Sequence, residues 1–313
     1  MTFPRVIDLG YGIGVMPEGG REFILRPENS ENVFWENPNF SSHAQWFNPG
    51  GGRTWISPEA ELYFPHMAVN GRDDHSVPPE IDPGHYEILE QRTGHISLQN
   101  RIELHFWNGK GDLPLILEKR IDALEQSPVD LPEGISFAGY RLKTVLRAEH
   151  APRPDQRPAV WNILQVPPDG EIRLKAGQEF NYFGRSSHTR NGEKITLSVP
   201  AKGEPYKLGF TPSPRQTMRF FYWNGQRGTP YFIVREFTAA SRCADIPFPD
   251  LPPDAKACPV QFFCDNGAIG GFGEMEYHAD YLKPEEPEVA DECLTYAFAG
   301  NRDVLSVLFE RFS

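Results

Sequence analysis

The sequence has 313 residues, 39% of them hydrophobic and 12% aromatic, so the chain can bury a large core and does not have a disordered composition. Its net charge of −12 argues against a nucleic-acid partner, because binding a phosphate backbone requires clustered Lys and Arg. No stretch has the length of a membrane span, and the first residues lack a secretory apolar core. We therefore expect a cytoplasmic protein without nucleic-acid or membrane partners.

Short apolar runs separated by Pro and Gly dominate the chain, which contains 30 Pro and 28 Gly. This pattern predicts an all-β fold, a large antiparallel sandwich with very little helix, formed as one domain by residues 1–313. The clearest predicted strands are residues 96–106, 115–122, 135–149, 160–166, 194–199, 218–223 and 229–239. Residues 301–312 have helical spacing, although a terminal strand pair also fits them.

Three consecutive glycines at residues 50–52 precede a segment rich in aromatic and charged side chains. Glycine permits either a close approach of backbone to a ligand or a positive φ. Arg53 offers a planar set of donors, and Trp55 offers a flat face for a sugar ring. Glu59 can accept hydrogen bonds from vicinal hydroxyls. The alternative, a glycine-rich turn followed by a core tryptophan, stays open.

Several familiar motifs are absent. The glycines at 10, 12 and 14 are not followed by a strand–helix unit, which excludes a dinucleotide site. There is no Gly-x-Ser-x-Gly motif, and the four cysteines match no zinc spacing, so we expect no cofactor. The cysteines are predicted to be buried free thiols, with a Cys243–Cys258 bridge as the alternative. Scattered histidines are interpreted as ordinary surface residues, namely His43, His75, His85 and His95.

Polar and apolar residues alternate from residue 273 to residue 280. In a strand, side chains at every second position share a face. The titratable face would carry Glu274, Glu276, His278 and Asp280, and the other face Met275, Tyr277 and Ala279. Three carboxylates in a row repel one another unless a cation, a proton or a sugar hydroxyl network lies among them. A solvated outer face is the alternative interpretation.

Three segments in this order resemble the galactose mutarotase-like superfamily, also called aldose 1-epimerase-like, and in particular its uncharacterised bacterial members. They are residues 50–59 (Gly-Gly-Gly-Arg-Thr-Trp-Ile-Ser-Pro-Glu), residues 159–166 (Ala-Val-Trp-Asn-Ile-Leu-Gln-Val), and residues 260–265 together with 272–278. The resemblance implies a β-supersandwich that binds a small-molecule carbohydrate. It also implies an aldose epimerase, an isomerase, as the enzyme class.

In epimerases of this superfamily, a glutamate on the late strand is the general base and a histidine on a central strand protonates the ring oxygen. The resemblance makes Glu276, or otherwise Glu274, the base, and neighbouring carboxylates would raise its pKa. The central strand here reads Trp161-Asn162-Ile163, without a histidine. The acid would therefore come from another element, and His66 is the candidate, with two other histidines, at 150 and 188, as further options.

The same resemblance implies that the sugar contacts Arg53, Trp55, Glu59, Trp161 and His278. Two other functions stay open. The missing histidine favours a non-catalytic sugar-binding or structural module. The third possibility is a metal-assisted enzyme resembling polysaccharide lyases, in which the acidic strand at 274–280 holds a hard cation such as calcium.

Overall fold

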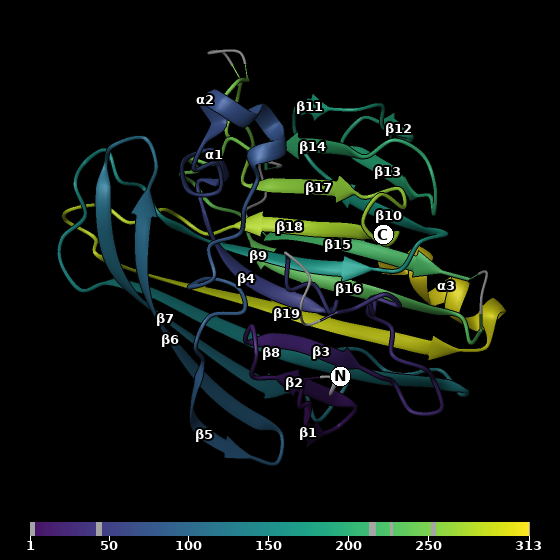
Figure 1. Cartoon of the computed structure of the whole chain (residues 1–313). Coiled ribbons are helices and arrows are strands. Elements are labelled where there is room, and N and C mark those ends of the chain that lie inside the picture. The colour runs from purple at the N-terminus through teal and green to yellow at the C-terminus, as the bar shows by residue number, and fades with distance from the viewer. Residues whose placement is uncertain (1–3, 42–45, 213–216, 226–227, 252–254, 313) are drawn as a thin grey trace.

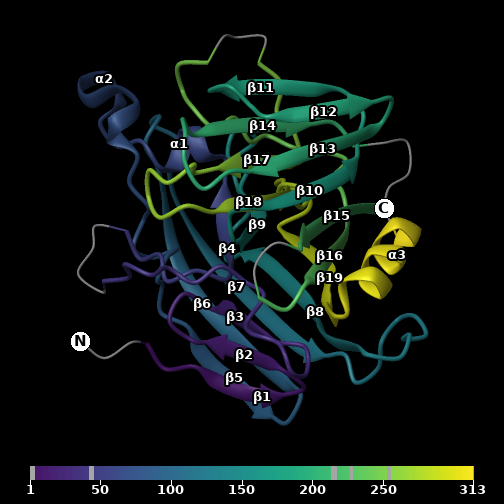
Figure 2. The same ribbon diagram turned by 90° about the vertical axis from the view of Figure 1, so that its right-hand side faces the viewer.

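The computed structural model describes residues 4–41, 46–212, 217–225, 228–251 and 255–312. In these residues the strands form two sheets that pack face to face (Figures 1 and 2). The nine-stranded sheet has the order β1 (Ile7–Gly10), β2 (Ile13–Met16), β3 (Arg21–Leu25), β4 (Gly52–Ser57), β9 (Ala159–Val166), β18 (Gly273–His278), β17 (Val260–Cys264), β14 (Tyr206–Phe210) and β11 (Glu179–Phe183).

The ten-stranded sheet contains the longest strands. Its order is β12 (His188–Asn191), β13 (Lys194–Val199), β10 (Gly170–Lys175), β15 (Thr217–Asn224), β16 (Tyr231–Thr238), β19 (Glu288–Gly300), β8 (Ile135–Ala148), β7 (Gly111–Ala123), β6 (His95–Phe106) and β5 (Glu87–Arg92). All strand pairings between these described elements are antiparallel. The predicted all-β antiparallel sandwich is confirmed.

Helix is scarce, as predicted. The short elements α1 (Glu59–Leu62), α2 (Met67–Asn70) and the 3-10 turn η1 (Gly71–Asp74) lie between β4 and β5. The C-terminal α3 (Arg302–Phe312) confirms the helical alternative for that segment. It packs on the outer side of β16 and β19, where the ring of Phe309 contacts the ring of Phe232 at 5.3 Å (Figure 2). Among the described residues, no helix is long and apolar enough to cross a membrane.

The core lies between the sheets, because alternate side chains of each strand point inward. Phe237 of β16 stacks on Tyr277 of β18 with ring centroids 4.1 Å apart, so this contact joins the two layers. All four cysteines are free thiols, and three of them are buried as predicted, whereas Cys243 is half-buried. His95 is buried and bonds Asp122 at 2.7 Å, so its interpretation as a surface residue is wrong. His43 lies outside the described residues.

Both faces of the central strands are covered. Every residue of β9 and of β18 is buried, since one face meets the other sheet and the second lies under aromatic side chains and loops. The solvated-face interpretation of residues 273–280 is therefore wrong. The prediction that Asp280 shares a strand face with Glu274, Glu276 and His278 is also wrong, because β18 ends at His278. The Asp280 carboxylate instead accepts hydrogen bonds from Ser241 and from the Arg242 backbone.

Candidate functional site

A pocket of about 290 Å³ lies on the nine-stranded sheet, on the face turned away from the other sheet. Strand register explains its composition, since directly opposed residues of paired strands share a face. Trp55 is opposite Trp161, Trp161 is opposite His278, and Phe263 of β17 lies between Lys207 and Glu274. The charged or titratable lining residues are Arg53, Glu59, His75, Lys207 and Glu274. The apolar lining residues are Trp46, Trp55, Trp161, Phe183, Phe248, Phe263 and Ile269.

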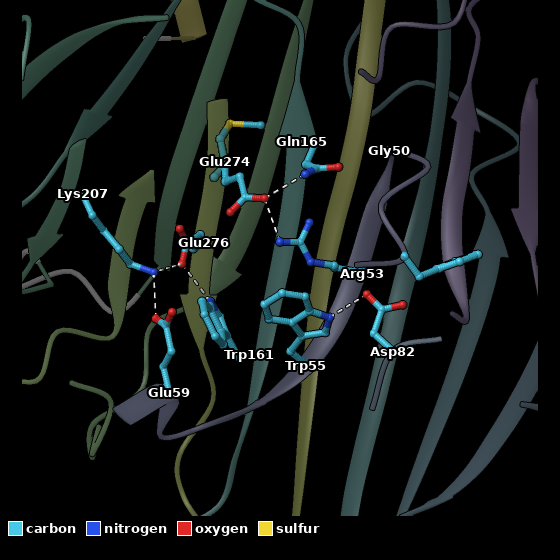
Figure 3. A network of polar contacts seen from close by, with 12 residues as sticks. Gly50, Arg53, Trp55, Glu59, Asp82, Trp161, Gln165, Lys207, Glu274 and Glu276 are labelled. Atoms are coloured by element: carbon cyan, nitrogen blue, oxygen red, sulfur yellow. Dashed lines mark hydrogen bonds and ion pairs between the residues drawn. The ribbon is translucent and has the colours of Figure 1, made fainter. Parts of the chain in front are cut away.

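Arg53 and Glu274 form a buried ion pair at one side of the pocket (Figure 3). Arg53 Nη2 lies 2.8 Å from Glu274 Oε1, and the same oxygen accepts a hydrogen bond from Gln165 Nε2 at 2.9 Å. The guanidinium lies over the rings of Trp55 and Trp46, at 4.2 Å and 5.3 Å from their centroids. The pair is therefore held by hydrogen bonds and by cation–π contacts.

The two glycines directly before β4, Gly50 and Gly51, both have positive φ. Gly51 has φ 73°, and a Cβ at this position would lie 2.5 Å from the Glu22 carbonyl oxygen. Of the two possibilities left open by the sequence, the positive φ applies. This close backbone approach to Glu22 and the turn before β4 bring Arg53 and Trp55 onto the pocket face. Trp55 Nε1 donates to Asp82 Oδ2 at 2.9 Å, which fixes the ring (Figure 3).

Lys207 lies between two buried carboxylates on the other side of the pocket (Figure 3). Its Nζ is 3.0 Å from Glu276 Oε2 and 3.3 Å from Glu59 Oε2, and it lies over the Trp161 ring at 4.7 Å. Trp161 Nε1 donates to Glu276 Oε2 at 2.9 Å. Burial lowers the pKa of Lys207, but the carboxylates of Glu276 and Glu59 outweigh it, so the net pKa is raised. The ammonium therefore stays charged.

Glu276 is completely buried. Burial raises its pKa to about 8, and the nearby Glu274 and Glu59 add to the rise although Lys207 opposes it. The sequence predicted this direction from neighbouring carboxylates, whereas desolvation is the larger cause. At neutral pH the buried acid therefore holds a proton that it can release with a small change of environment.

Glu59 is placed by a loop far away in the sequence. Its backbone N–H donates to Asp245 Oδ1 at 2.7 Å, and its Oε1 lies 3.3 Å from His75 Nε2. Burial raises the pKa of Glu59, whereas Lys207 and His75 lower it. The two partners together outweigh burial, so the net pKa of Glu59 is lowered. Burial and the charge of Glu59 together raise the pKa of Asp245 to about 6.

His278 lies behind the pocket. Its ring stacks on Trp161 with centroids 5.4 Å apart, Nδ1 is 3.2 Å from Ser57 Oγ, and Nε2 is 3.6 Å from Asp245. Burial and the positive charge of Lys207 keep the pKa of His278 well below its usual value. His278 thus supports the Trp161 ring as a neutral imidazole and is absent from the pocket lining.

The structure brings five of the predicted site residues together as pocket lining: Arg53, Trp55, Glu59, Trp161 and Glu274. Glu276 and His278 are enclosed beside the pocket. His66 is exposed before α2, where its ring is 6.4 Å from Trp107, and it is not among the pocket-lining residues. The two other optional histidines are also elsewhere, one exposed after β8 and one on β12 beside Glu179.

Sequence reasoning missed Lys207, Asp245 and the pocket role of His75. Lys207 could have been found from its position inside the apolar run Tyr206 to Phe210. A buried strand rarely contains a lysine unless that lysine is paired with an opposite charge. His75 lies on the surface as predicted, but it also lines the pocket. In the described residues, no group of three or more His, Cys, Asp or Glu side chains is arranged to hold a metal ion.

No protein-family model and no curated protein matches the sequence. The fold, however, is similar to solved structures along its whole length. A proposed aldose 1-epimerase from Escherichia coli K12 has a TM-score of 0.59 at 11% identity, with 94% of this chain and 98% of that chain covered. A proposed aldose 1-epimerase from Klebsiella pneumoniae has a TM-score of 0.55 at 10% identity, covering 96% and 79%.

A third solved structure, from Synechocystis, has a TM-score of 0.51 at 11% identity and covers 96% of this chain and 97% of its own. Similarity at such low identity defines the fold and leaves the reaction to be argued from the site. The chain has the galactose mutarotase-like fold, as the sequence resemblance implied.

Proposed function

We propose that the pocket binds one aldose ring and that the protein is an aldose 1-epimerase, which interconverts the two anomers. The observation that carries the proposal is the position of Glu274 and Lys207 in one aromatic-lined pocket, in a fold shared with proposed aldose 1-epimerases. Trp55 and Trp161 supply flat faces for the ring. The volume of about 290 Å³ is at the lower end of the range for small-molecule sites, about 300–1,000 Å³, and suits a monosaccharide.

Glu274 is the better placed of the two predicted bases. A general base must reach the proton that it removes, and Glu274 lines the pocket whereas Glu276 is enclosed by Trp161 and Lys207. Glu274 Oε1 accepts the bonds from Arg53 and Gln165. We assign Oε2 to accept the proton of the anomeric hydroxyl.

Lys207 is the acid in this proposal, and Glu276 supplies its proton. Lys207 lines the pocket and donates to Glu276, whose raised pKa of about 8 keeps a proton in reserve at neutral pH. As Lys207 protonates the ring oxygen, Glu276 passes its proton to Lys207.

Protons and bonds balance in this scheme. Glu274 takes the proton of O1, the C1–O5 bond breaks, O5 receives the proton from Lys207, and C1 becomes a carbonyl. Rotation about C1–C2 presents the other face of the carbonyl. The reverse transfers close the ring as the other anomer and return both protons, so no group is consumed.

A non-catalytic sugar-binding module is the second candidate, and one observation favours it. The charged groups of the pocket already neutralise one another, with Arg53 on Glu274 and Lys207 on both Glu59 and Glu276. Such a site can bind sugar hydroxyls through the side-chain atoms that face the pocket, without transferring a proton.

Anomerisation of freshly dissolved α-aldoses, followed by NMR, tests the proposal. We expect acceleration over buffer, with a loss of about 100-fold or more in Glu274→Gln and in Lys207→Met, because each removes one proton-transfer partner. Glu288→Gln is the matched control, since Glu288 is exposed on β19 of the other sheet. Sugar binding without acceleration would support the binding module, and full activity in Glu274→Gln would reject the assigned base.

A further inference from the structure

An apolar patch surrounds Lys207. Phe183, Lys207, Phe263 and Glu274 form one row in register across β11, β14, β17 and β18, so a phenylalanine lies on each side of the lysine. The Phe183 and Phe263 rings are 6.3 Å apart, and Phe248 contacts Phe183 at 5.3 Å. No serine, threonine, asparagine, glutamine or tyrosine is among the described residues that line the pocket.

Ile269 extends this apolar surface and is held in position. It lines the pocket yet is 47% exposed. The Asp265 carboxylate accepts hydrogen bonds from the backbone N–H groups of Gly267, Ile269, Gly270 and Gly271, at 2.7–3.1 Å. An apolar side chain that is kept in water by a fixed loop is stabilised when a ligand covers it.

The proposed orientation of the sugar determines which of its substituents contacts the apolar patch around Lys207. If Glu274 takes the proton of the anomeric hydroxyl and Lys207 protonates the ring oxygen, the substituent on ring carbon C5 lies on the side of Lys207 away from Glu274. Phe183 lies on that side of Lys207, in contact with Phe248. A hydroxymethyl group packed against these rings would lose hydrogen bonds to water that a phenylalanine side chain cannot replace. A methyl group at the same place would instead bury apolar surface.

We infer, on the basis of the proposed function, that the substrate is a 6-deoxyaldose, a sugar with a methyl group where an ordinary hexose has a hydroxymethyl group. Charged residues bind the anomeric end, and the phenylalanines with Ile269 select the methyl end. The small pocket volume of about 290 Å³ leaves room for a single ring with such a substituent.

Matched sugar pairs test this inference with the unmodified protein. The pairs are D-fucose with D-galactose, L-rhamnose with L-mannose, and 6-deoxy-D-glucose with D-glucose. For each pair we measure kcat/KM for anomerisation and the dissociation constant. We expect the deoxy sugar to be preferred by about 10- to 100-fold in at least one pair, the range that an apolar pocket gives against one added hydroxyl.

The outcomes separate the inference from the proposed function. Equal acceleration of both members of every pair would overturn the inference and leave the epimerase intact. Preferential binding of deoxy sugars without acceleration would uphold the inference and reject the epimerase. Ile269→Thr keeps the branched Cβ and replaces the ethyl branch by a hydroxyl, so it should reduce the preference several-fold. Ile88→Thr, on β5 and 41% exposed, is the matched control and should leave the preference unchanged.

Discussion

The ammonium of Lys207 lies 3.0 Å from the carboxylate of Glu276, and both groups are buried. Glu59 approaches the same ammonium at 3.3 Å, so two carboxylates share one positive charge. A proton on Glu276 neutralises this cluster, which agrees with its pKa of about 8. The cluster therefore holds a proton next to a cation that lines the pocket.

Glu276→Gln should change how stability depends on pH. The pKa of Glu276 rises from 4.5 to about 8 on folding, so between these values the folded state holds a proton that the unfolded chain has released. Its contribution to the free energy of unfolding therefore falls as the pH rises from about 5 to about 8. Glutamine cannot ionise, so the variant should gain stability relative to wild type over this range.

Urea titrations of both proteins between pH 5 and pH 8.5 measure this difference. His278 has the opposite effect near pH 6.5, since its pKa is lowered on folding, but it contributes equally to both proteins. A relative gain of more than about 1.4 kcal/mol, equivalent to one pKa unit, is expected. Parallel stability curves would contradict the buried proton.

Arg53→Met should destabilise the fold by about 3–5 kcal/mol, because Glu274 would remain buried without its cation. The double variant Arg53→Met/Glu274→Gln should recover part of this loss. Urea unfolding of the single and double variants measures the coupling. Arg101→Met is the control, since Arg101 and its partner Glu149 are exposed and their pair contributes about 0–1 kcal/mol. Additive losses in the double variant would show that the ion pair is not coupled.

Local patterns were sufficient to predict much of the fold. Alternation in residues 96–106 fixed which side chains face the core, and that segment is β6. The same reasoning placed Glu274, Glu276 and His278 on one face of β18. It failed at Asp280, because the strand ends before this residue and no local pattern marks the end.

The site depends on pairings that no local pattern contains. Lys207 reaches Glu276 only because β17 lies between β14 and β18, and Glu59 reaches Lys207 from a helix 148 residues earlier. His66 follows Arg53 and Glu59 closely in the sequence, but it is not among the pocket-lining residues, whereas His75, nine residues later, is. Sheet order is a tertiary property, and it decides which charges meet.

Asp245→Ala should cost about 1–2 kcal/mol, because it leaves the backbone N–H of Glu59 without an acceptor and removes one of the two acceptors of the Gln261 side-chain amide, which keeps only the Cys258 carbonyl oxygen. Asp245→Asn restores one acceptor oxygen and should cost less. Thermal unfolding and sugar titration of both variants measure the effect. Asp155→Ala, an exposed aspartate beside Arg153, is the control. Equal stability of the alanine variant and wild type would show that Asp245 does not hold Glu59.

The pH dependence of anomerisation tests the proton path. We expect kcat/KM to fall as the pH rises through about 8, because Glu276 then loses the proton that it passes to Lys207. Lys207→Arg keeps a cation between Glu59 and Glu276, but a guanidinium does not release a proton in proteins. This variant should therefore be as slow as Lys207→Met, about 100-fold below wild type, although its fold and sugar affinity persist. A rate close to wild type in Lys207→Arg would mean that Lys207 acts by its charge alone, and the proton would then have to reach the ring oxygen by another route.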